Sequence, residues 1–180
     1  MVPSLTGTLV DAAEPCSLFV VTTSGPACNA SEVGETRRAA KVLLVDEHSR
    51  VLLFSGIDRS KPDVKPWWFA VGGALEDGED VAAGATRELP EETGLAVDGP
   101  GPPLFTRRFS WDFEGIEYEQ EETYFLVRTR AFEPVAAGWS ETEVATMRGH
   151  RWWSIDDLQT TKEVVYPENL GELLVRLLGE

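Results

Sequence analysis

The segment between Gly72 and Leu95, GGALEDGEDVAAGATRELPEETGL, constrains the fold most strongly. A strand-like run, WWFAV, leads directly into its two glycines. From Asp80 to Thr93, small and apolar residues recur at helical spacing, and Asp80 is placed to cap the helix. The local order is therefore strand, glycine loop and helix.

Strands and helices are expected on both sides of this segment. Short apolar runs bounded by turn residues predict two hairpins, and a stripe of leucines predicts a helix at the C-terminal end. The expected elements are a hairpin of 39–46 and 49–56, a hairpin of 104–113 and 116–130, a strand ending at Trp153 with a helix capped by Ser154, and a helix over 168–178. Their order predicts a mixed α/β domain with helices packed on a sheet.

The domain boundary is expected near residue 36. Residues 1–36 are rich in small residues, Pro, Ser and Thr, and contain one strand-like piece at 18–22. They are interpreted as an N-terminal extension without an assigned function. Residues 37–180 form the predicted domain, in keeping with a chain long enough for one good core.

The charge balance limits the partners. The chain has 16 Lys and Arg against 31 Asp and Glu, a formal charge of −15, which argues against an extended grip on nucleic acid. The two cysteines, Cys16 and Cys28, favour a reduced, cytoplasmic setting, with one bridge between them as the alternative. The early apolar run is too short for a signal peptide or a membrane span, so no membrane partner is expected. A homodimer stays open.

Three carboxylates crowd one face of the predicted helix. At about 100° per residue, Glu88, Glu91 and Glu92 fall within an arc of roughly 100°. Arg87 precedes Glu91 by four residues and can neutralise only part of this charge. A solvated acidic face is the alternative, but like charges repel at this spacing, and a hard cation such as Mg²⁺ accepts such ligands.

The surroundings of this face also favour a ligand. Gly84 and Ala85 flank it one turn earlier, so an open approach to the carboxylates is expected. Gly72 and Gly73 allow the backbone to come close to an ion, although an ordinary turn would also explain them. Pro90 interrupts the helix on the opposite side. It either kinks the helix and draws the glutamates together or opens a separate final turn.

The spacing of these residues resembles a complete Nudix box. The matching positions are Gly73, Glu79, Arg87, Glu88, Leu89, Glu91, Glu92, Gly94 and Leu95. Val71 departs from the pattern, since the family commonly has proline before the glycine pair. The resemblance extends over roughly residues 37–178. It implies an α/β/α sandwich with a mixed sheet.

The resemblance also implies an activity. Nudix hydrolases use Mg²⁺ or Mn²⁺ to cleave a diphosphate linked to another moiety, typically in nucleoside diphosphate derivatives, so a small-molecule nucleotide or other diphosphate is the expected substrate. By this resemblance Glu88, Glu91 and Glu92 are metal ligands, the Gly73 carbonyl is a further ligand, and Glu79 supports or joins the metal cluster. Arg87 would orient a neighbouring glutamate.

The catalytic base has two candidate locations. Glu88 is the first candidate, because a carboxylate beside a metal-bound water can accept its proton. The family sometimes uses a base outside the box, and Glu119, Glu121 and Glu122 are available, with Glu122 preferred over the alternative of a solvated sheet edge. A silent nucleotide-binding or sensing module is the rival function, but no glutamate of the box is missing.

Other notable side chains are expected to be structural. Arg107 and Arg108 point to opposite faces of a strand, so at most one reaches a phosphate, and a solvent-facing arginine is the favoured interpretation. The tryptophans at strand positions could stack on a base, but core packing is the favoured interpretation, and for His150 structural packing is favoured over catalysis. These tryptophans are Trp67, Trp68, Trp111, Trp152 and Trp153.

Overall fold

The computed structural model describes residues 20–22, 36–135 and 138–179. The strands are β1 (Val20–Thr22), β2 (Arg37–Val45), β3 (Val51–Gly56), β4 (Trp67–Ala70), β5 (Phe105–Phe113), β6 (Ile116–Arg128), β7 (Met147–Trp153) and β8 (Val164–Tyr166). The helices are α1 (Val81–Thr93), α2 (Glu141–Thr146), α3 (Ile155–Thr160) and α4 (Leu170–Leu178). Most of the predicted extension, with Cys16 and Cys28, lies outside the described residues, and the division at residue 36 stays a prediction.

The described strands form one mixed sheet in the order β1-β5-β6-β2-β3-β4-β8, with β7 paired to β3. The predicted hairpin of β5 and β6 is confirmed, with Glu114 and Gly115 at its turn. β6 also pairs in parallel along the whole of β2. The turn residues take positive φ, 51° at Glu114 and 79° at Gly115. These are the left-handed conformations that a two-residue type I′ turn requires.

The predicted hairpin of β2 and β3 is limited to its turn. The two strands are in register only at Val45 and Val51, because the edges of β3 are taken by β4 and β7. Beyond the turn, β3 moves away from β2. The chain after β4 pairs with the edge of β2 in its place, through bridges from Val42 to Val71 and from Ala39 to Ala74. This divergence brings Gly72 and Gly73 beside β2.

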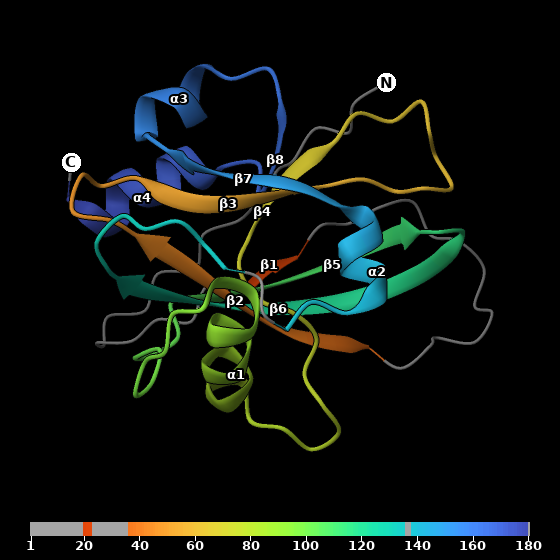
Figure 1. The fold of residues 1–180 in the computed structure, drawn as a ribbon, viewed down its shortest axis with the longest axis horizontal. Coiled ribbons are helices and arrows are strands. Elements are labelled where there is room, and N and C mark those ends of the chain that lie inside the picture. The colour runs from red at the N-terminus through yellow and green to blue at the C-terminus, as the bar shows by residue number, and fades with distance from the viewer. Residues whose placement is uncertain (1–19, 23–35, 136–137, 180) are drawn as a thin grey trace.

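Helices cover both faces of the sheet (Figure 1). Alternate residues of β2 supply two apolar clusters, as expected for a strand buried on both sides. Val42 and Leu44 pack in the cluster that includes Ala85 and Leu89 of α1. Leu43 and Val45 belong to the cluster of α4, with Leu170 and Leu174. The α/β/α sandwich with a mixed sheet is therefore confirmed.

The predicted helix starts follow their capping residues. The Asp80 side chain accepts from the backbone N–H of Ala82 at the start of α1, and Ser154 forms a capping box with Asp157 at the start of α3. The helix α2 and the strand β8 were not predicted, since elements this short show no clear periodicity. Within the described residues, every helix is too short or too polar to cross a membrane.

Candidate active site

Two of the three carboxylates on the acidic face of α1 are buried, whereas the Glu91 side chain is 43% exposed. Glu88 is 7% exposed and Glu92 is 3% exposed, since both lie beneath the chain segment that follows β4. Leu75 also covers the preceding turn, where a Cβ on Gly84 would lie only 2.3 Å from Leu75 Cδ2. The expectation of an open approach past Gly84 and Ala85 is therefore wrong.

Arg87 connects the carboxylates of this face. Its Nη1 donates to Glu88 Oε1 at 2.9 Å and to Glu91 Oε2 at 3.0 Å. Its Nε and Nη2 both donate to Glu79, each at 3.0 Å, and Nη2 reaches the Ala74 carbonyl oxygen at 3.2 Å. One guanidinium thus fixes three carboxylates and the loop after the glycine pair, a wider role than the single i,i+4 pairing with Glu91.

The glycine pair is required by close contacts. Gly72 has φ of 115°, and a Cβ there would lie 2.2 Å from the Ala40 carbonyl oxygen. A Cβ on Gly73 would lie 2.7 Å from Glu88 Oε1. The Gly73 carbonyl accepts from the Ala40 N–H at 3.0 Å, and a carbonyl oxygen has a second lone pair for another partner. Gly72 is therefore needed for the backbone, whereas Gly73 leaves room for the Glu88 carboxylate in its present position.

Glu92 is held under the same loop. Its Oε2 accepts from the Gly72 N–H at 2.6 Å. Burial raises the pKa of Glu92 to about 7, against the opposing influence of the Lys41 ammonium and of the Gly72 N–H. The group is therefore poised to ionise near neutral pH.

Glu88 and Glu79 both bind Arg87, but their pKa values shift in opposite directions because Glu88 is more buried. Burial raises the pKa of Glu88, although Arg87 and Lys41 oppose the increase. The hydrogen bonds from Arg87 lower the pKa of Glu79, which also accepts from the Glu76 N–H. Glu88 thus has the raised pKa expected of a proton acceptor, whereas Glu79 is a fixed anion that anchors Arg87.

Lys41 lies at the centre of these charges and was not identified from the sequence. It is 9% exposed, and its Nζ donates to the Gly72 carbonyl oxygen. Its charge opposes the increase in the pKa of Glu88 and Glu92 and helps to lower the pKa of Glu122. A lysine inside the apolar run AAKVLLV was the available signal, because a buried lysine needs anionic partners.

Glu122 on β6 is a further buried carboxylate, 5% exposed. Its Oε2 accepts from Arg107 Nη2 at 2.7 Å and from the Tyr124 hydroxyl at 2.7 Å. Its Oε1 accepts from Gln120 Nε2 at 2.9 Å. Burial opposes ionisation, but Arg107 and Lys41 prevail and lower the pKa of Glu122. The solvated-edge alternative is wrong for Glu122, and the expectation of a solvent-facing arginine is wrong for Arg107.

The neighbouring residues follow the predicted alternation. Glu121 pairs with Arg108 on the opposite face, and Glu119 accepts from the Ser110 hydroxyl at an exposed position. Trp153 is fully buried, whereas Trp67 and Trp111 belong to neither apolar cluster, so the expected core position is wrong for these two. Trp68 and Trp152 each pack against one of the two clusters, as expected. His150 packs edge-on against Phe54 and contacts Glu133, in keeping with a structural role.

Pro90 lies inside α1, which continues through it to Thr93. The alternative in which the helix ends before Pro90 is therefore wrong. The last turn is secured from outside, since Glu91 O accepts from the Gly138 N–H at 2.9 Å and Thr93 O accepts from the Val135 N–H at 3.0 Å. Gly138 packs so closely on Glu91 that a Cβ there would lie 2.8 Å from Glu91 Cβ. This contact fixes the backbone of Glu91.

The oxygen atoms of this region suit a hard divalent cation, although they are not gathered into a ready cluster. No group of three or more His, Cys, Asp or Glu side chains in the described ranges is arranged to hold a metal. Glu88 and Glu91 share one nitrogen of Arg87, and Glu91 is the most exposed of the box glutamates that Arg87 binds. Carboxylate and carbonyl oxygens are the ligands that Mg²⁺ and Mn²⁺ accept, so the donor set fits such an ion.

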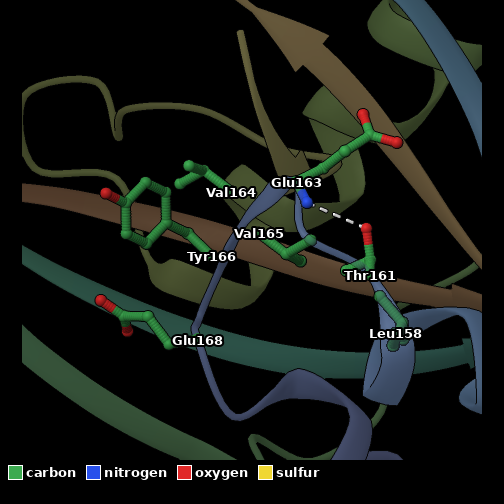
Figure 2. Close-up of a pocket in the computed structure, with 7 residues that line it drawn as sticks. All are labelled: Leu158, Thr161, Glu163, Val164, Val165, Tyr166 and Glu168. Carbon is green, nitrogen blue, oxygen red and sulfur yellow. Dashed lines mark hydrogen bonds between the residues drawn. The ribbon is translucent and has the colours of Figure 1, made fainter. Parts of the chain in front are cut away.

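A surface pocket beside β8 is separate from this region (Figure 2). In Figure 2 the Glu163 carboxylate points away from Tyr166 and Glu168. The lining therefore lacks converging acidic groups. The lining residues are Leu158, Thr161, Glu163, Val164, Val165, Tyr166 and Glu168, and none of them belongs to the predicted site.

The sandwich fold, together with the glutamates of α1 under a glycine pair, defines the class as that of the Nudix hydrolases. The NUDIX domain model matches residues 35–173, and the chain belongs to this family. The identification made from the box is therefore confirmed.

Individual relatives agree with this assignment. Over 62 residues the chain is 44% identical to an RNA pyrophosphohydrolase of Dinoroseobacter shibae, a match that spans 34% of this chain and only 36% of that relative. The structure of a MutT protein from Methanosarcina mazei Go1 has a TM-score of 0.60 at 17% identity, covering 83% of this chain and 100% of the other. A MutT Nudix hydrolase from Burkholderia pseudomallei has a TM-score of 0.54 at 18% identity, covering 78% and 98%. At these identities the structures establish a common fold.

Proposed function

We propose that this protein hydrolyses a phosphoanhydride bond in a nucleoside diphosphate linked to another moiety, with Mg²⁺ or Mn²⁺ as cofactor. The observation that carries the proposal is the contact between Gly73 and the buried Glu88 carboxylate, which the box sequence alone does not require. Burying this carboxylate costs free energy unless a cation or hydrogen bonds compensate it. Arg87 and Lys41 compensate the buried carboxylates only in part.

Four groups would hold the metal ion. They are the carboxylates of Glu88, Glu91 and Glu92 and the second lone pair of the Gly73 carbonyl. When bound, the ion would neutralise charge on the phosphate oxygens and lower the pKa of a coordinated water. Glu79 contributes indirectly, because it holds the Arg87 guanidinium against Glu88 and Glu91.

Glu88 is the preferred proton acceptor in this mechanism. Its pKa is raised by burial, which strengthens it as a base. Glu122 stays the second candidate, but both of its oxygens accept hydrogen bonds and its pKa is lowered. A catalytic role for Glu122 would require it to release at least one of these donors. Arg87 would keep the Glu88 carboxylate oriented toward the reacting water.

A phosphate-release screen tests the function. The panel contains nucleoside triphosphates, sugar nucleotides, dinucleotides and ADP-ribose, each with Mg²⁺, with Mn²⁺ and with EDTA. RNA with a 5′-triphosphate joins the panel because of the name of the matched relative, although the charge of −15 disfavours a long RNA. Turnover of one class that stops with EDTA supports the proposal. Binding without turnover across the panel would favour the nucleotide-sensing alternative.

The binding partner and the cellular location are part of the same proposal. A small-molecule diphosphate would be the partner, in the cytoplasm and without a membrane or extended nucleic acid. Sedimentation at several concentrations decides between a monomer and a homodimer. Localisation of the tagged full chain tests the cytoplasmic assignment.

A further inference from the structure

Four aromatic side chains gather on one face of the β5/β6 hairpin and belong to neither apolar cluster. They are Phe109, Trp111, Phe113 and Tyr118, here called the aromatic patch. The Trp111 ring centroid lies 5.4 Å from that of Phe113 and 5.6 Å from that of Tyr118. All four rings are partly exposed. Aromatic rings that leave the core and stay together need another reason for their position.

The aromatic patch shares its face with the buried charges. Residues alternate along a strand, so Tyr118, Gln120 and Glu122 point to the same side of β6. Trp111 Nε1 donates to Gln120 Oε1 at 3.0 Å, and Gln120 Nε2 donates to Glu122 Oε1 at 2.9 Å. Lys41 lies on the same face of β2, two residues after Ala39, which is in register with Glu122, and its Nζ donates to the Gly72 carbonyl oxygen. A row of polar side chains on this face, opposite α1, thus leads from the patch to the glycine pair.

Arg37 adds a positive charge beside the aromatic patch. Its guanidinium carbon lies 5.5 Å from the Tyr118 ring centroid, and β2 places Arg37 in register with Gln120. Among the described residues no carboxylate forms an ion pair with Arg37. A guanidinium beside a cluster of tilted aromatic rings suits a ligand that carries both a ring and a negative charge.

The hairpin end is also held in place. The Asp58 carboxylate accepts from the Glu114 N–H at 3.1 Å, and Lys61 forms an ion pair with Asp112. The loop between β3 and β4 therefore anchors the turn that carries Phe113. A fixed aromatic surface loses little entropy when a ring stacks on it.

We propose that the aromatic patch and Arg37 bind the base and a phosphate of a nucleoside substrate, and thereby place its phosphoanhydride bond at Glu88. This inference rests on the proposed hydrolase function. The nucleobase stacks on Trp111 and Tyr118. Arg37 contacts the phosphate, from which the rest of the substrate extends toward Lys41. A nucleotide is the favoured occupant because ring and phosphate are needed together.

Trp111→Ala and the conservative Trp111→Phe test the assignment. For the nucleoside substrate found by the screen, W111A should raise KM about tenfold or more and leave kcat within about twofold, since stacking binds ground and transition states alike. W111F should restore most of the affinity. For a ribosyl diphosphate without a base, W111A should leave KM unchanged. Equal effects on both substrates, or none on the nucleoside substrate, would overturn the inference.

A binding measurement separates this inference from the hydrolase function. Calorimetry with AMP, GMP, CMP and UMP in EDTA needs no turnover. Weaker binding by W111A, with W111F close to wild type, supports the aromatic patch even if no substrate is cut. Equal binding by all three proteins, each shown to be folded by circular dichroism, contradicts it.

Discussion

Gly73 and Glu88 are in direct contact, and a Cβ on Gly73 would lie 2.7 Å from Glu88 Oε1 and 2.9 Å from its Oε2. The glycine is needed here for space, since its φ is not in the positive range. The contact joins the chain segment after β4 to the third turn of α1. A change at residue 73 therefore acts first on the carboxylate of Glu88, the proposed proton acceptor.

Gly73→Ala is expected to lower activity far more than stability. The added methyl meets the end of a flexible side chain, so Glu88 can turn away at little cost to the fold. A displaced catalytic carboxylate should reduce kcat/KM by about 100-fold, as found when one stabilising group of an active site is lost. Gly99→Ala is the control, because a Cβ there meets nothing within 4 Å. Steady-state kinetics and thermal melting of both variants make the comparison.

Glu91→Gln should remove activity by orders of magnitude while the fold stays intact. Glu91 is only partly buried and its carboxylate contacts Arg87, so the amide loses charge without leaving a cavity. Glu172→Gln, an exposed substitution on α4, controls for loss of an acidic side chain. Wild-type turnover by E91Q would contradict the assignment of Glu91 as a metal ligand.

The box and the mixed α/β class were predictable because they depend on local spacing and periodicity, and the sandwich arrangement followed from the resemblance to the Nudix family. The helix at Asp80–Thr93, its cap and the β5/β6 hairpin all follow from short-range patterns. The burial of Glu88 was not predictable, because it depends on β2 leaving β3 and pairing with 71–74. For the same reason Lys41 was missed, since its partners come from α1 and β6. Long-range strand pairing is not encoded in a local pattern.

Lys41→Met should destabilise the protein strongly. The methionine keeps the length of the side chain but leaves the Gly72 carbonyl and the nearby carboxylates without their cation. Removing one partner of a buried ionic group costs about 3 kcal/mol or more. Lys65→Met, at an exposed lysine, is the matched control. Free energies of unfolding from urea titration should differ clearly between the two variants, and equal values would show that Lys41 has no such role.

Pro90→Ala tests whether the proline shapes the metal site. Proline lacks the N–H that would bond to the Thr86 carbonyl and crowds it, a cost of up to about 3 kcal/mol in a helix interior. The alanine variant should therefore raise the free energy of unfolding. If the bend draws Glu91 and Glu92 toward Glu88, Mn²⁺ affinity measured by electron paramagnetic resonance should fall. Unchanged affinity would limit Pro90 to a local effect on the helix.

The raised pKa of Glu92 predicts a pH dependence of stability in metal-free protein. Burial raises this pKa from 4.5 to about 7, so the folded state holds a proton that the unfolded state has lost. The contribution is complete below pH 4.5 and decreases as the pH rises toward 7, at about 1.4 kcal/mol per pH unit at most. Glu92→Gln should remove this part of the decrease, since the amide stays neutral and can still accept from the Gly72 N–H. Urea titrations in EDTA between pH 5 and pH 8 measure the effect, with E172Q as control. A slope as steep in E92Q as in wild type would show that another group causes the decrease.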